Sequence, residues 1–386
     1  MASMAWRQAC SPWLWYRGAI LIVCATFARG DDRILTAGAI NDLPAKFALD
    51  TGAGLPFVAV ESKAAAFALT DRGQPGANRA PSLDVVGQAH ARSITVFGRK
   101  YSDVTFSLIA DGSPALVKDF DALIGWPAVR DGVVLLDLGD NTATYTDEPP
   151  KVSWGWHTFS IVTADVLVLE TGSRTESSRV LVDTGLDDGV HLGATAWTDW
   201  LSHHSRDRYA LDAAYSPGQG VLVRRQYFSA RLKLGGLVLK NVMVSAMTDL
   251  DQHLAGTNVD AVIGMAALRH LKMYVEGGRH IARVREAGHA NLRQNYNRLG
   301  AVFVPKGGDM SALYATVAPG SPAASADIRD GDILVEVDGR STADYLDHGI
   351  SFSSLWNRPP GTSCRLIVQR GGQRLKKDIV LASYLD

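Results

Sequence analysis

The tripeptide Asp-Thr-Gly occurs twice in the chain, at residues 50–52 and 183–185. Each copy directly follows a run of apolar residues that predicts a buried strand. Further along, each copy is matched by a second shared segment, Asp-Ala-Leu-Ile-Gly at residues 121–125 and Asp-Ala-Val-Ile-Gly at residues 260–264. A single Asp-Thr-Gly is usually an ordinary turn, because Asp and Gly are favoured in turns for backbone reasons. Two copies in the same order and context predict an internal duplication.

This duplicated pattern resembles the bilobal aspartic proteases of the pepsin and retropepsin type. The resemblance implies a mainly β fold, in which two retropepsin-like β lobes form a cleft between them. Lobe 1 would span residues 31–150 and lobe 2 residues 151–288. Because both lobes belong to one chain, we expect the active unit to be a monomer, whereas retropepsins assemble theirs across a dimer.

The chemistry of such a site explains why two carboxylates are needed. Two carboxyl groups held close together cannot both ionise at low cost, so they share one proton. The ionised member takes a proton from a water molecule, and the protonated member hydrogen-bonds the carbonyl oxygen of the substrate. The resemblance assigns these catalytic roles to Asp50 and Asp183. It implies an endopeptidase that hydrolyses peptide bonds without a metal or any other cofactor.

The resemblance also gives roles to the residues that follow each aspartate. Thr51 and Thr184 would lock the two turns against each other. Gly52 and Gly185 would let the two backbones approach closely, because glycine accepts conformations that a side chain forbids. The Ile-Gly pair at the end of each second shared segment would pack beside the Asp turn of its own lobe. We therefore expect these residues to support the active-site turns.

The second lobe departs from the family pattern directly after its Asp-Thr-Gly. Leu186 stands where pepsin-like enzymes usually have a small hydroxyl residue that hydrogen-bonds the catalytic carboxylate. Asp187 and Asp188 add negative charge, although we expect them to face solvent in the turn before a short helix near residues 194–201. These departures keep open an alternative from another class, a catalytically inactive protein that captures peptides in the bilobal cleft.

Retropepsin-like lobes carry a hairpin flap between the two shared segments. Polar, glycine-containing stretches lie at the corresponding places in this chain. We predict flap tips that bind substrate at Gly87 and Gln88 in lobe 1 and at Gly218 and Gln219 in lobe 2. The alternative is that both stretches are plain surface loops. After each stretch, two alternating apolar segments around a glycine turn predict a further hairpin.

Residues 1–30 have the layout of a signal peptide for export. Arg7 precedes an apolar core at residues 18–25, and the small residues Ala28 and Gly30 offer sites for cleavage. The apolar core is short for a transmembrane helix, but an uncleaved N-terminal membrane anchor remains the alternative. The segment predicts an exported protein.

Cysteine usage and charge limit the cellular compartments and the classes of partner that we expect for this chain. Removal of the signal peptide would take away Cys10 and Cys24 and leave Cys364 alone, so no intrachain disulfide and no cysteine metal cluster could form. Export without disulfides is common in a bacterial periplasm, so we predict a periplasmic or secreted protein. The 39 Lys and Arg residues nearly balance the 40 Asp and Glu residues, which gives none of the charge asymmetry that nucleic-acid binding needs. The ten His residues form no ligand-spaced set, so we expect no metal site.

The C-terminal part of the chain carries a different pattern. Residues 309–324 read as a strand followed by Pro-Gly-Ser-Pro-Ala and the start of a helix. Residues 326–339 contain Gly-Asp-Ile-Leu, a strand and Asp-Gly, and a further alternating strand lies at residues 364–369. This order of segments resembles that of a PDZ domain. We therefore predict a small α/β PDZ domain at residues 295–386.

A PDZ domain binds an extended peptide as an added strand at a sheet edge, and backbone N–H groups of a loop hold the C-terminal carboxylate of the peptide. Leu299, Gly300 and Ala301 lie where this carboxylate-binding loop is expected. The alternative is that they only begin the first strand and bind no carboxylate. The resemblance implies a C-terminal or extended peptide as partner, and a role in recruiting polypeptide substrates or in regulating the protease.

Overall fold

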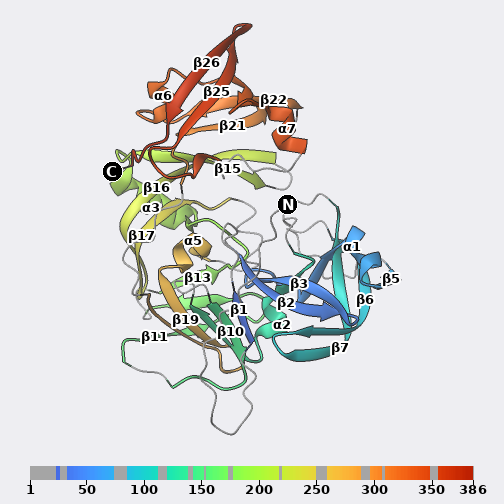
Figure 1. The fold of residues 1–386 in the computed structure, drawn as a ribbon. Helices are drawn as coiled ribbons and strands as arrows, with labels where there is room; N and C mark the ends of the chain where they lie inside the picture. The colour runs from blue at the N-terminus through green and yellow to red at the C-terminus, as the bar shows by residue number, and fades with distance from the viewer. Residues whose placement is uncertain are drawn as a thin grey trace.

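The structure is a computed structural model of the 386-residue chain. It is mainly β, with strands arranged in three sheets and short helices at their edges (Figure 1). The described residues are 23–26, 33–73, 85–111, 120–137, 142–151, 154–172, 177–216, 220–248, 259–287, 296–306, 309–347 and 355–385.

The first sheet has seven strands, and we call it lobe 1. In spatial order the strands are β2 (Ile34–Ile40), β3 (Leu43–Asp50), β8 (Ala122–Gly125), β4 (Phe57–Val60), β7 (Arg99–Ile109), β6 (Val85–Val96) and β5 (Thr70–Gly73). Helix α1 (Glu61–Ala66) follows β4, and helix α2 (Trp126–Val129) follows β8.

The second sheet has thirteen strands, of which all but the first three in spatial order follow residue 150 in the chain. In spatial order they are β1 (Val23–Thr26), β10 (Thr142–Thr146), β9 (Val133–Asp137), β19 (Leu271–Glu276), β20 (Ile281–Glu286), β11 (His157–Ile161), β12 (Val168–Thr171), β13 (Ser178–Val182), β18 (Ala261–Ile263), β14 (Val190–Leu192), β17 (Leu237–Ala246), β16 (Gly220–Leu234) and β15 (Tyr209–Ser216). Its helices are α3 (Ala194–His204), α5 (Met265–Leu268) and the 3-10 turn η1 (Gly277–Arg279). We call the seven strands from β12 to β15 in this spatial order lobe 2.

Strand order is the same in the two lobes. Lobe 1 runs β2-β3-β8-β4-β7-β6-β5, and lobe 2 runs β12-β13-β18-β14-β17-β16-β15. The pairings also match, since β3 is parallel to β8 as β13 is to β18, and β4 is antiparallel to β8 as β14 is to β18. The remaining strands mirror each other as β1-β10-β9 and β11-β20-β19 around the β9–β19 pair. The architecture is therefore a twofold repeat, as the two Asp-Thr-Gly motifs predict.

The strands that carry the motifs are buried on both faces. Val180, Leu181 and Val182 of β13 are all 0% exposed, and so are Ala261 and Ile263 of the neighbouring β18. Strands covered on both sides read as continuous apolar runs rather than as alternating ones. This burial explains why an unbroken apolar run precedes each Asp-Thr-Gly, and it places each motif at the end of a rigid strand.

Two predicted boundaries at the N-terminal side do not coincide with structural units. Strands β9 and β10 precede residue 150, where the sequence predicts the end of lobe 1, yet they belong to the second sheet. Val23–Thr26 lies within the predicted signal peptide but forms β1, which pairs with β10. Cleavage at residue 28 or 30 would remove this strand, so the cleavage site is in conflict with the fold. Within the described part of the chain, no helix is long and apolar enough to cross a membrane.

The third sheet belongs to the C-terminal module. Its path is β21 (Ala301–Lys306), β22 (Asp309–Val317), β23 (Ile333–Val337), β25 (Ser363–Arg370) and β26 (Gln373–Val380), and β24 (Arg340–Ser341) pairs with β23. Helices α6 (Pro322–Ser325) and α7 (Thr342–Asp347) accompany it. The core of this module is separate from that of the lobes and contains Phe303, Trp356 and Leu366.

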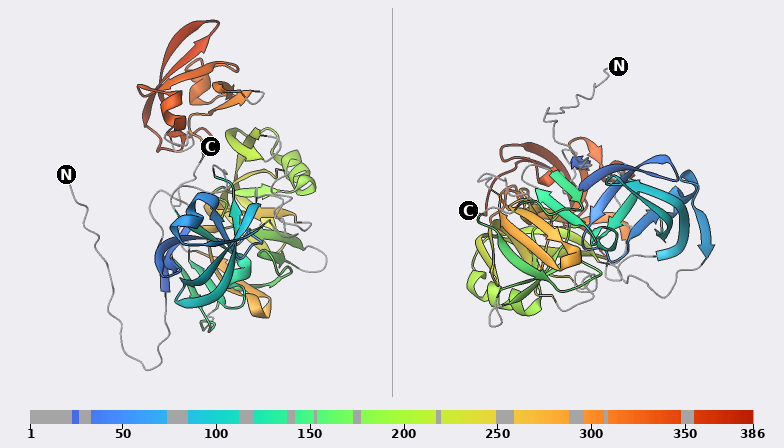
Figure 2. Two further views of the ribbon diagram at one scale, coloured as in Figure 1. Left: turned by 90° about the vertical axis from the view of Figure 1, so that its right-hand side faces the viewer. Right: turned by 90° about the horizontal axis from the view of Figure 1, so that it is seen from below.

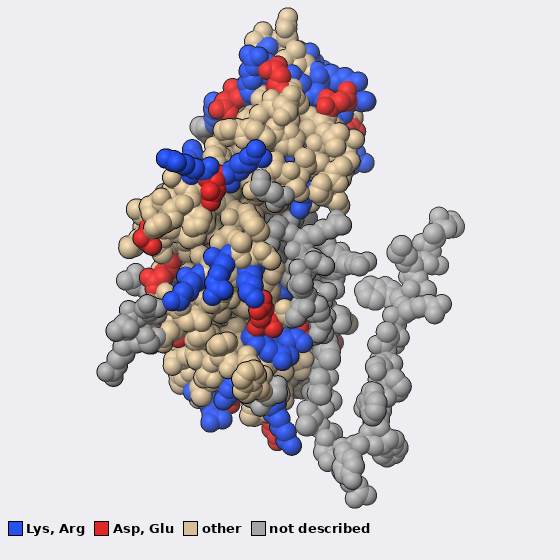
Figure 3. Space-filling view, turned by 90° about the vertical axis from the view of Figure 1, so that its left-hand side faces the viewer, with Lys and Arg blue, Asp and Glu red and all other residues tan. Residues whose placement is uncertain are grey.

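The C-terminal module lies at one end of the molecule, beyond β15 (Figure 2). Charged side chains of both signs are interspersed over the face drawn in Figure 3. This mixture agrees with the near-equal totals of acidic and basic residues in the sequence.

Candidate functional site

Each Asp-Thr-Gly turn begins where its strand ends beside a parallel neighbour. Asp50 is the last residue of β3 and pairs with Gly125 of β8. Asp183 directly follows β13, and its N–H donates to the carbonyl oxygen of Ile263 in β18 at 3.0 Å. The Ile-Gly pairs therefore lie beside the two turns, as the sequence predicts.

The aspartate that opens each second shared segment has a structural role that the sequence analysis did not identify. Asp121 accepts a hydrogen bond from the backbone N–H of Lys46 at 2.9 Å, and Asp260 accepts one from the N–H of Arg179 at 2.8 Å. The backbone N–H of Asp121 donates in return to the Lys46 carbonyl, and that of Asp260 to the Arg179 carbonyl. Lys46 and Arg179 each stand four residues before the Asp of their Asp-Thr-Gly. The carboxylates thus fix the register of the motif strands.

The two turns exchange hydrogen bonds through their threonines. The N–H of Thr51 donates to Oγ1 of Thr184 at 3.0 Å, and the N–H of Thr184 donates to Oγ1 of Thr51 at 3.2 Å. Each hydroxyl also donates to the opposite strand, Thr51 to the carbonyl of Val182 at 2.6 Å and Thr184 to that of Leu49 at 2.8 Å. Both threonines are 0% exposed. Four buried hydrogen bonds therefore join the turns.

The glycines allow each carboxylate to lie against the opposite turn. The N–H of Gly52 donates to Oδ1 of Asp50 at 2.9 Å, and the N–H of Gly185 donates to Oδ1 of Asp183 at 2.8 Å. A Cβ on Gly52 would lie 2.5 Å from Cγ of Asp183. A Cβ on Gly185 would collide with the carboxylate of Asp50. Only a residue without a side chain leaves room for the facing carboxylate.

The two carboxylates are hydrogen-bonded to each other. Burial raises the pKa of Asp50 above its ordinary value, against the opposing effects of the hydrogen bond to Asp183 and of the charge on Arg33. Asp183 is 6% exposed. Arg33, whose guanidinium lies over the ring of Phe120, is a neighbour of the pair that no sequence motif indicates. A paired carboxyl group with a raised pKa is suited to hold a shared proton.

Leu186 and Asp187 follow the second turn. The Leu186 carbonyl accepts a hydrogen bond from the N–H of Met265 at 2.7 Å, and its side chain packs on a small apolar cluster of lobe 2. An isobutyl group has no donor to offer the carboxylate of Asp183. Asp187 is exposed, as expected.

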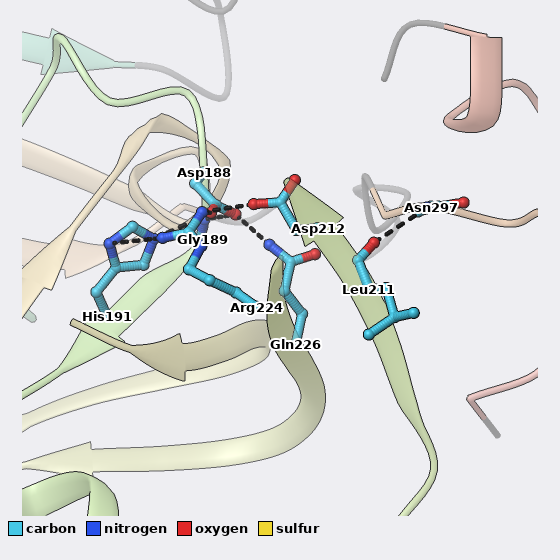
Figure 4. Close-up of polar contacts among 8 residues, drawn as sticks. All are labelled: Asp188, Gly189, His191, Leu211, Asp212, Arg224, Gln226 and Asn297. Carbon is cyan, nitrogen blue, oxygen red and sulfur yellow. Dashed lines mark hydrogen bonds and ion pairs between the residues drawn. The ribbon is translucent and has the colours of Figure 1, made fainter. Parts of the chain in front are cut away.

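Asp188 does not face solvent, which corrects the expectation from sequence. Its carboxylate accepts from Nη2 of Arg224 at 2.6 Å and from Nε2 of Gln226 at 2.8 Å, and it lies 3.0 Å from Nε2 of His191 (Figure 4). Arg224 also donates to Asp212 at 2.5 Å. The side chains of His191, Arg224 and Asp188 are 1%, 12% and 14% exposed. A buried ionic network thus lies five residues beyond Asp183.

The network depends on pairing that the sequence does not encode locally. Arg224 and Gln226 stand two apart in β16, so their side chains lie on the same face of the sheet. Asp212 belongs to β15 and is paired with Arg224 across the hairpin. Burial alone would raise the pKa of Asp188, but the Arg224 charge and the hydrogen bond from His191 hold it well below its usual range.

The predicted flap tips have different outcomes in the two lobes. Gly87 and Gln88 lie inside β6, where they pair with Leu108 and Ser107 of β7, so the prediction of a tip at these residues is wrong. The connection between β5 and β6 comprises residues 74–84, outside the described residues. Gly218 and Gln219 also lie outside the described residues, in the connection between the paired strands β15 and β16. We call β15 and β16 the lobe 2 hairpin.

A side chain of the protein itself occupies the N–H groups of the predicted carboxylate-binding loop. The N–H groups of Leu299 and Gly300 both donate to Oδ1 of Asn297, at 3.1 and 3.0 Å. Leu299 and Ala301 are 0% exposed. Gly300 has a φ of 73° and lies against Ser321, whose Cβ a side chain would overlap. As it stands, the loop offers neither of these two N–H groups to a peptide, because Asn297 occupies them.

Other candidate centres among the described residues are few. No group of three or more His, Cys, Asp or Glu side chains that could hold a metal ion occurs in the described part of the chain. Cys364 is buried in the C-terminal module, and burial raises its thiol pKa to about 11. The Gly-Asp segment of the C-terminal pattern is structural, since Asp332 accepts two hydrogen bonds from Arg370 at 2.7 and 2.8 Å.

Comparison with known protein families matches residues 313–370 to the PDZ domain. The match lies within the predicted module at residues 295–386 and does not extend to lobes 1 and 2. A comparison with curated proteins finds no match. Residues 313–370 of this mainly β chain therefore form a PDZ domain.

Proposed function

We propose that the chain is an aspartic-type endopeptidase whose PDZ domain recruits substrates or regulates cleavage. The observation that carries the proposal is the reciprocal contact of two Asp-Thr-Gly turns, in which each carboxylate lies against the glycine of the opposite turn. An ordinary turn needs no partner of this kind. Rigid strands that end at the two aspartates support a site held in fixed geometry, which catalysis requires.

In the proposed reaction, Asp50 holds the shared proton and Asp183 is ionised, in keeping with the raised pKa of Asp50. A water molecule attacks the carbonyl carbon of the peptide bond and gives a proton to Asp183, while Asp50 donates its proton to the carbonyl oxygen. The proton on Asp183 then moves to the amide nitrogen. The carbon–nitrogen bond breaks and Asp50 recovers its proton, so no metal, cofactor or covalent intermediate takes part.

The proposed substrate is an extended polypeptide that lies in a cleft between the lobes. PDZ domains bind extended peptides, which agrees with a polypeptide partner. Since one chain supplies both aspartates, the proposed active unit is a monomer. Export to a bacterial periplasm, or secretion, remains part of the proposal.

The test is cleavage of a denatured protein mixture from acidic to neutral pH. We expect the wild-type protein to cut, and Asp50→Asn and Asp183→Asn each to abolish cutting. A statine-type mimic of the tetrahedral intermediate should inhibit the wild type. If the wild type cuts nothing, or if either variant cuts equally well, the proposal fails. The chain is then better described by the alternative, a peptide-binding protein without catalysis.

A further inference from the structure

The carboxamide of Asn297 makes every hydrogen bond that such a group can make. Its Oδ1 accepts from the N–H groups of Leu299 and Gly300. Its Nδ2 donates to the carbonyl of Ala301 at 2.8 Å and to the carbonyl of Leu211 at 3.0 Å. A carboxamide has two donors and two acceptor positions, so none is left over. Turning the group over would face donors with donors, so the network fixes its orientation.

Of these four partners, only Leu211 lies outside the C-terminal module. Leu211 belongs to β15 of the lobe 2 hairpin, 86 residues before Asn297 (Figure 4). Asn297 is 6% exposed, so solvent offers no replacement for a lost partner. One side chain therefore joins the loop of the PDZ domain to the hairpin of lobe 2.

The surface around this link is apolar on both sides. Tyr296, Val302, Ala318 and Tyr384 of the C-terminal module form one buried cluster with residues of lobe 2. The lobe 2 members are Ala210, Leu211 and Met243. The hydroxyl of Tyr384 donates to the Asn297 carbonyl at 3.1 Å, and Arg208 donates to the Tyr384 carbonyl at 3.2 Å. Strand β15 lies beside β21, the edge strand of the third sheet (Figure 1).

The same hairpin reaches the active-site turn. Asp212, next to Leu211, accepts from Arg224, and Arg224 donates to Asp188. Asp188 lies five residues after Asp183. Hydrogen bonds thus run from the PDZ loop through Asn297, the lobe 2 hairpin and Arg224 to the segment that follows the second Asp-Thr-Gly.

We infer that Asn297 is an internal occupant of the carboxylate-binding loop, and that the free α-carboxylate of a peptide displaces it and releases the lobe 2 hairpin. A carboxylate oxygen accepts from the same two N–H groups more strongly than an amide oxygen does. Once Oδ1 is displaced, Nδ2 loses its orientation toward Leu211. Peptide binding and hairpin docking therefore oppose each other, and each weakens the other by the same factor.

The meaning of this coupling for activity rests on the proposed endopeptidase function, but its test does not. The protein is the full chain carrying Asp50→Asn, so that no probe is consumed. The probe is a fluorescent pool of short peptides of mixed sequence that end in Ala, Val or Leu with a free carboxylate. The same pool with amidated C-termini is the control. Binding is measured by anisotropy and hairpin docking by hydrogen exchange across residues 209–234.

Two substitutions of Asn297 separate occupancy of the loop from the link to the hairpin. Asn297→Ala frees both N–H groups, and we expect the free-acid pool to bind about tenfold tighter, as removal of two competing hydrogen bonds allows. Asn297→Asp keeps an acceptor on both N–H groups and loses the donor to Leu211. It should therefore show faster exchange in the hairpin without tighter peptide binding.

A third substitution acts from the side of the hairpin. Ala210→Asp places a charge in the buried cluster, and reciprocity then predicts tighter binding of the free-acid pool. Ala213→Asp lies on the same strand at an exposed position and should change neither measurement. Slow exchange in β25 shows that the PDZ domain remains folded. If Asn297→Ala unfolds the PDZ domain, binding of the free-acid pool to Ala210→Asp decides between the outcomes.

The inference stands if the free-acid pool binds Asn297→Ala and Ala210→Asp more tightly than the parent and speeds exchange in the hairpin of the parent, while the amidated pool does neither. It is overturned if the free-acid pool binds neither Asn297→Ala nor Ala210→Asp more tightly than the parent, or if it binds the parent and leaves exchange in the hairpin unchanged. These outcomes do not depend on whether the wild type cleaves peptide bonds.

Discussion

Arg224 and Asp188 connect the lobe 2 hairpin to the segment that follows the second Asp-Thr-Gly through a hydrogen bond of 2.6 Å between Nη2 and Oδ2. Arg224 lies on β16, whereas Asp188 belongs to the segment between β13 and β14. The backbone of this segment is held as well, because the Asp188 carbonyl accepts from the N–H of Ala266 at 3.1 Å. The position of Asp183 is therefore tied to that of the hairpin.

Replacing Arg224 should destabilise the protein. Arg224→Met leaves the buried carboxylate of Asp188 without its cation, and we expect the free energy of unfolding to fall by about 3 kcal/mol. Urea denaturation measures this loss. Arg231→Met, at an exposed position on the same strand, should change stability by less than about 0.5 kcal/mol. In the double variant Arg224→Met with Asp188→Asn, most of the loss should be recovered. A full loss in the double variant would show that packing, not charge, is responsible.

Asp50→Asn should stabilise the folded protein near neutral pH. The pKa of Asp50 is raised in the folded state, so above its ordinary value of 3.8 the unfolded chain loses this proton first. The folded state then loses stability as pH rises from that value through the folded pKa. Asparagine cannot ionise and avoids the loss. Urea unfolding should show a gain over wild type near neutral pH and none below the ordinary value. Asp207→Asn, at an exposed position, should show no such pH dependence.

Gly52→Ala should disrupt the facing arrangement of the two turns and abolish cleavage, whereas Gly54→Ala should be tolerated. The new methyl group at residue 52 would lie 2.5 Å from Cγ of Asp183, and that at residue 54 would lie 3.7 Å from the carbonyl oxygen of Asp165. Cleavage assays and thermal unfolding on both variants give the comparison. Equal effects of the two substitutions would contradict the facing arrangement of the turns.

Thr51→Val should cost about 2 kcal/mol in the free energy of unfolding, because the buried Val182 carbonyl and the buried N–H of Thr184 both lose a partner. Thr51→Ser keeps the hydroxyl and should recover most of that energy. Chemical denaturation distinguishes the two. If serine is no better than valine, the methyl group of Thr51 matters more than its hydrogen bonds.

The N-terminal strand gives a prediction about processing. A chain that begins at residue 23 keeps β1, and one that begins at residue 31 exposes the edge of β10. We expect the longer chain to unfold at the higher temperature, which differential scanning calorimetry measures. Mass spectrometry of the natural N-terminus then shows whether the cell retains or removes this strand. Equal melting temperatures would mean that β1 adds nothing to the fold.

Features that depend on one short segment can be predicted from the sequence. Contacts between segments far apart in the chain cannot. The apolar run before each Asp-Thr-Gly is a local feature, and it correctly indicates a buried strand ending at each aspartate. The PDZ pattern is likewise local, with turn residues at fixed offsets. By contrast, Arg224 belongs to no motif, and its contact with Asp188 exists only because β16 folds back beside the second Asp-Thr-Gly turn.

Two of the predicted binding segments contain backbone groups whose partners the local sequence does not reveal. Gly87 and Gln88 have the composition of a turn, but they lie within β6 and pair with Leu108 and Ser107 of β7. Leu299 and Gly300 have the composition of a binding loop, and the sequence does not reveal that the side chain of Asn297 already accepts hydrogen bonds from both of their N–H groups. Composition does not reveal whether a polar group already has a partner.

The presence of two matching lobes in one chain has a consequence for how the contact between the Asp-Thr-Gly turns depends on protein concentration. Each Asp-Thr-Gly turn is held by hydrogen bonds from the opposite half, so neither half can complete the arrangement alone. In two separate copies, the encounter of the turns would depend on concentration. Here a covalent connection holds the halves at a constant effective concentration. The central β9–β19 pair makes that connection a continuous sheet, so the aspartates remain together even where the protein is scarce.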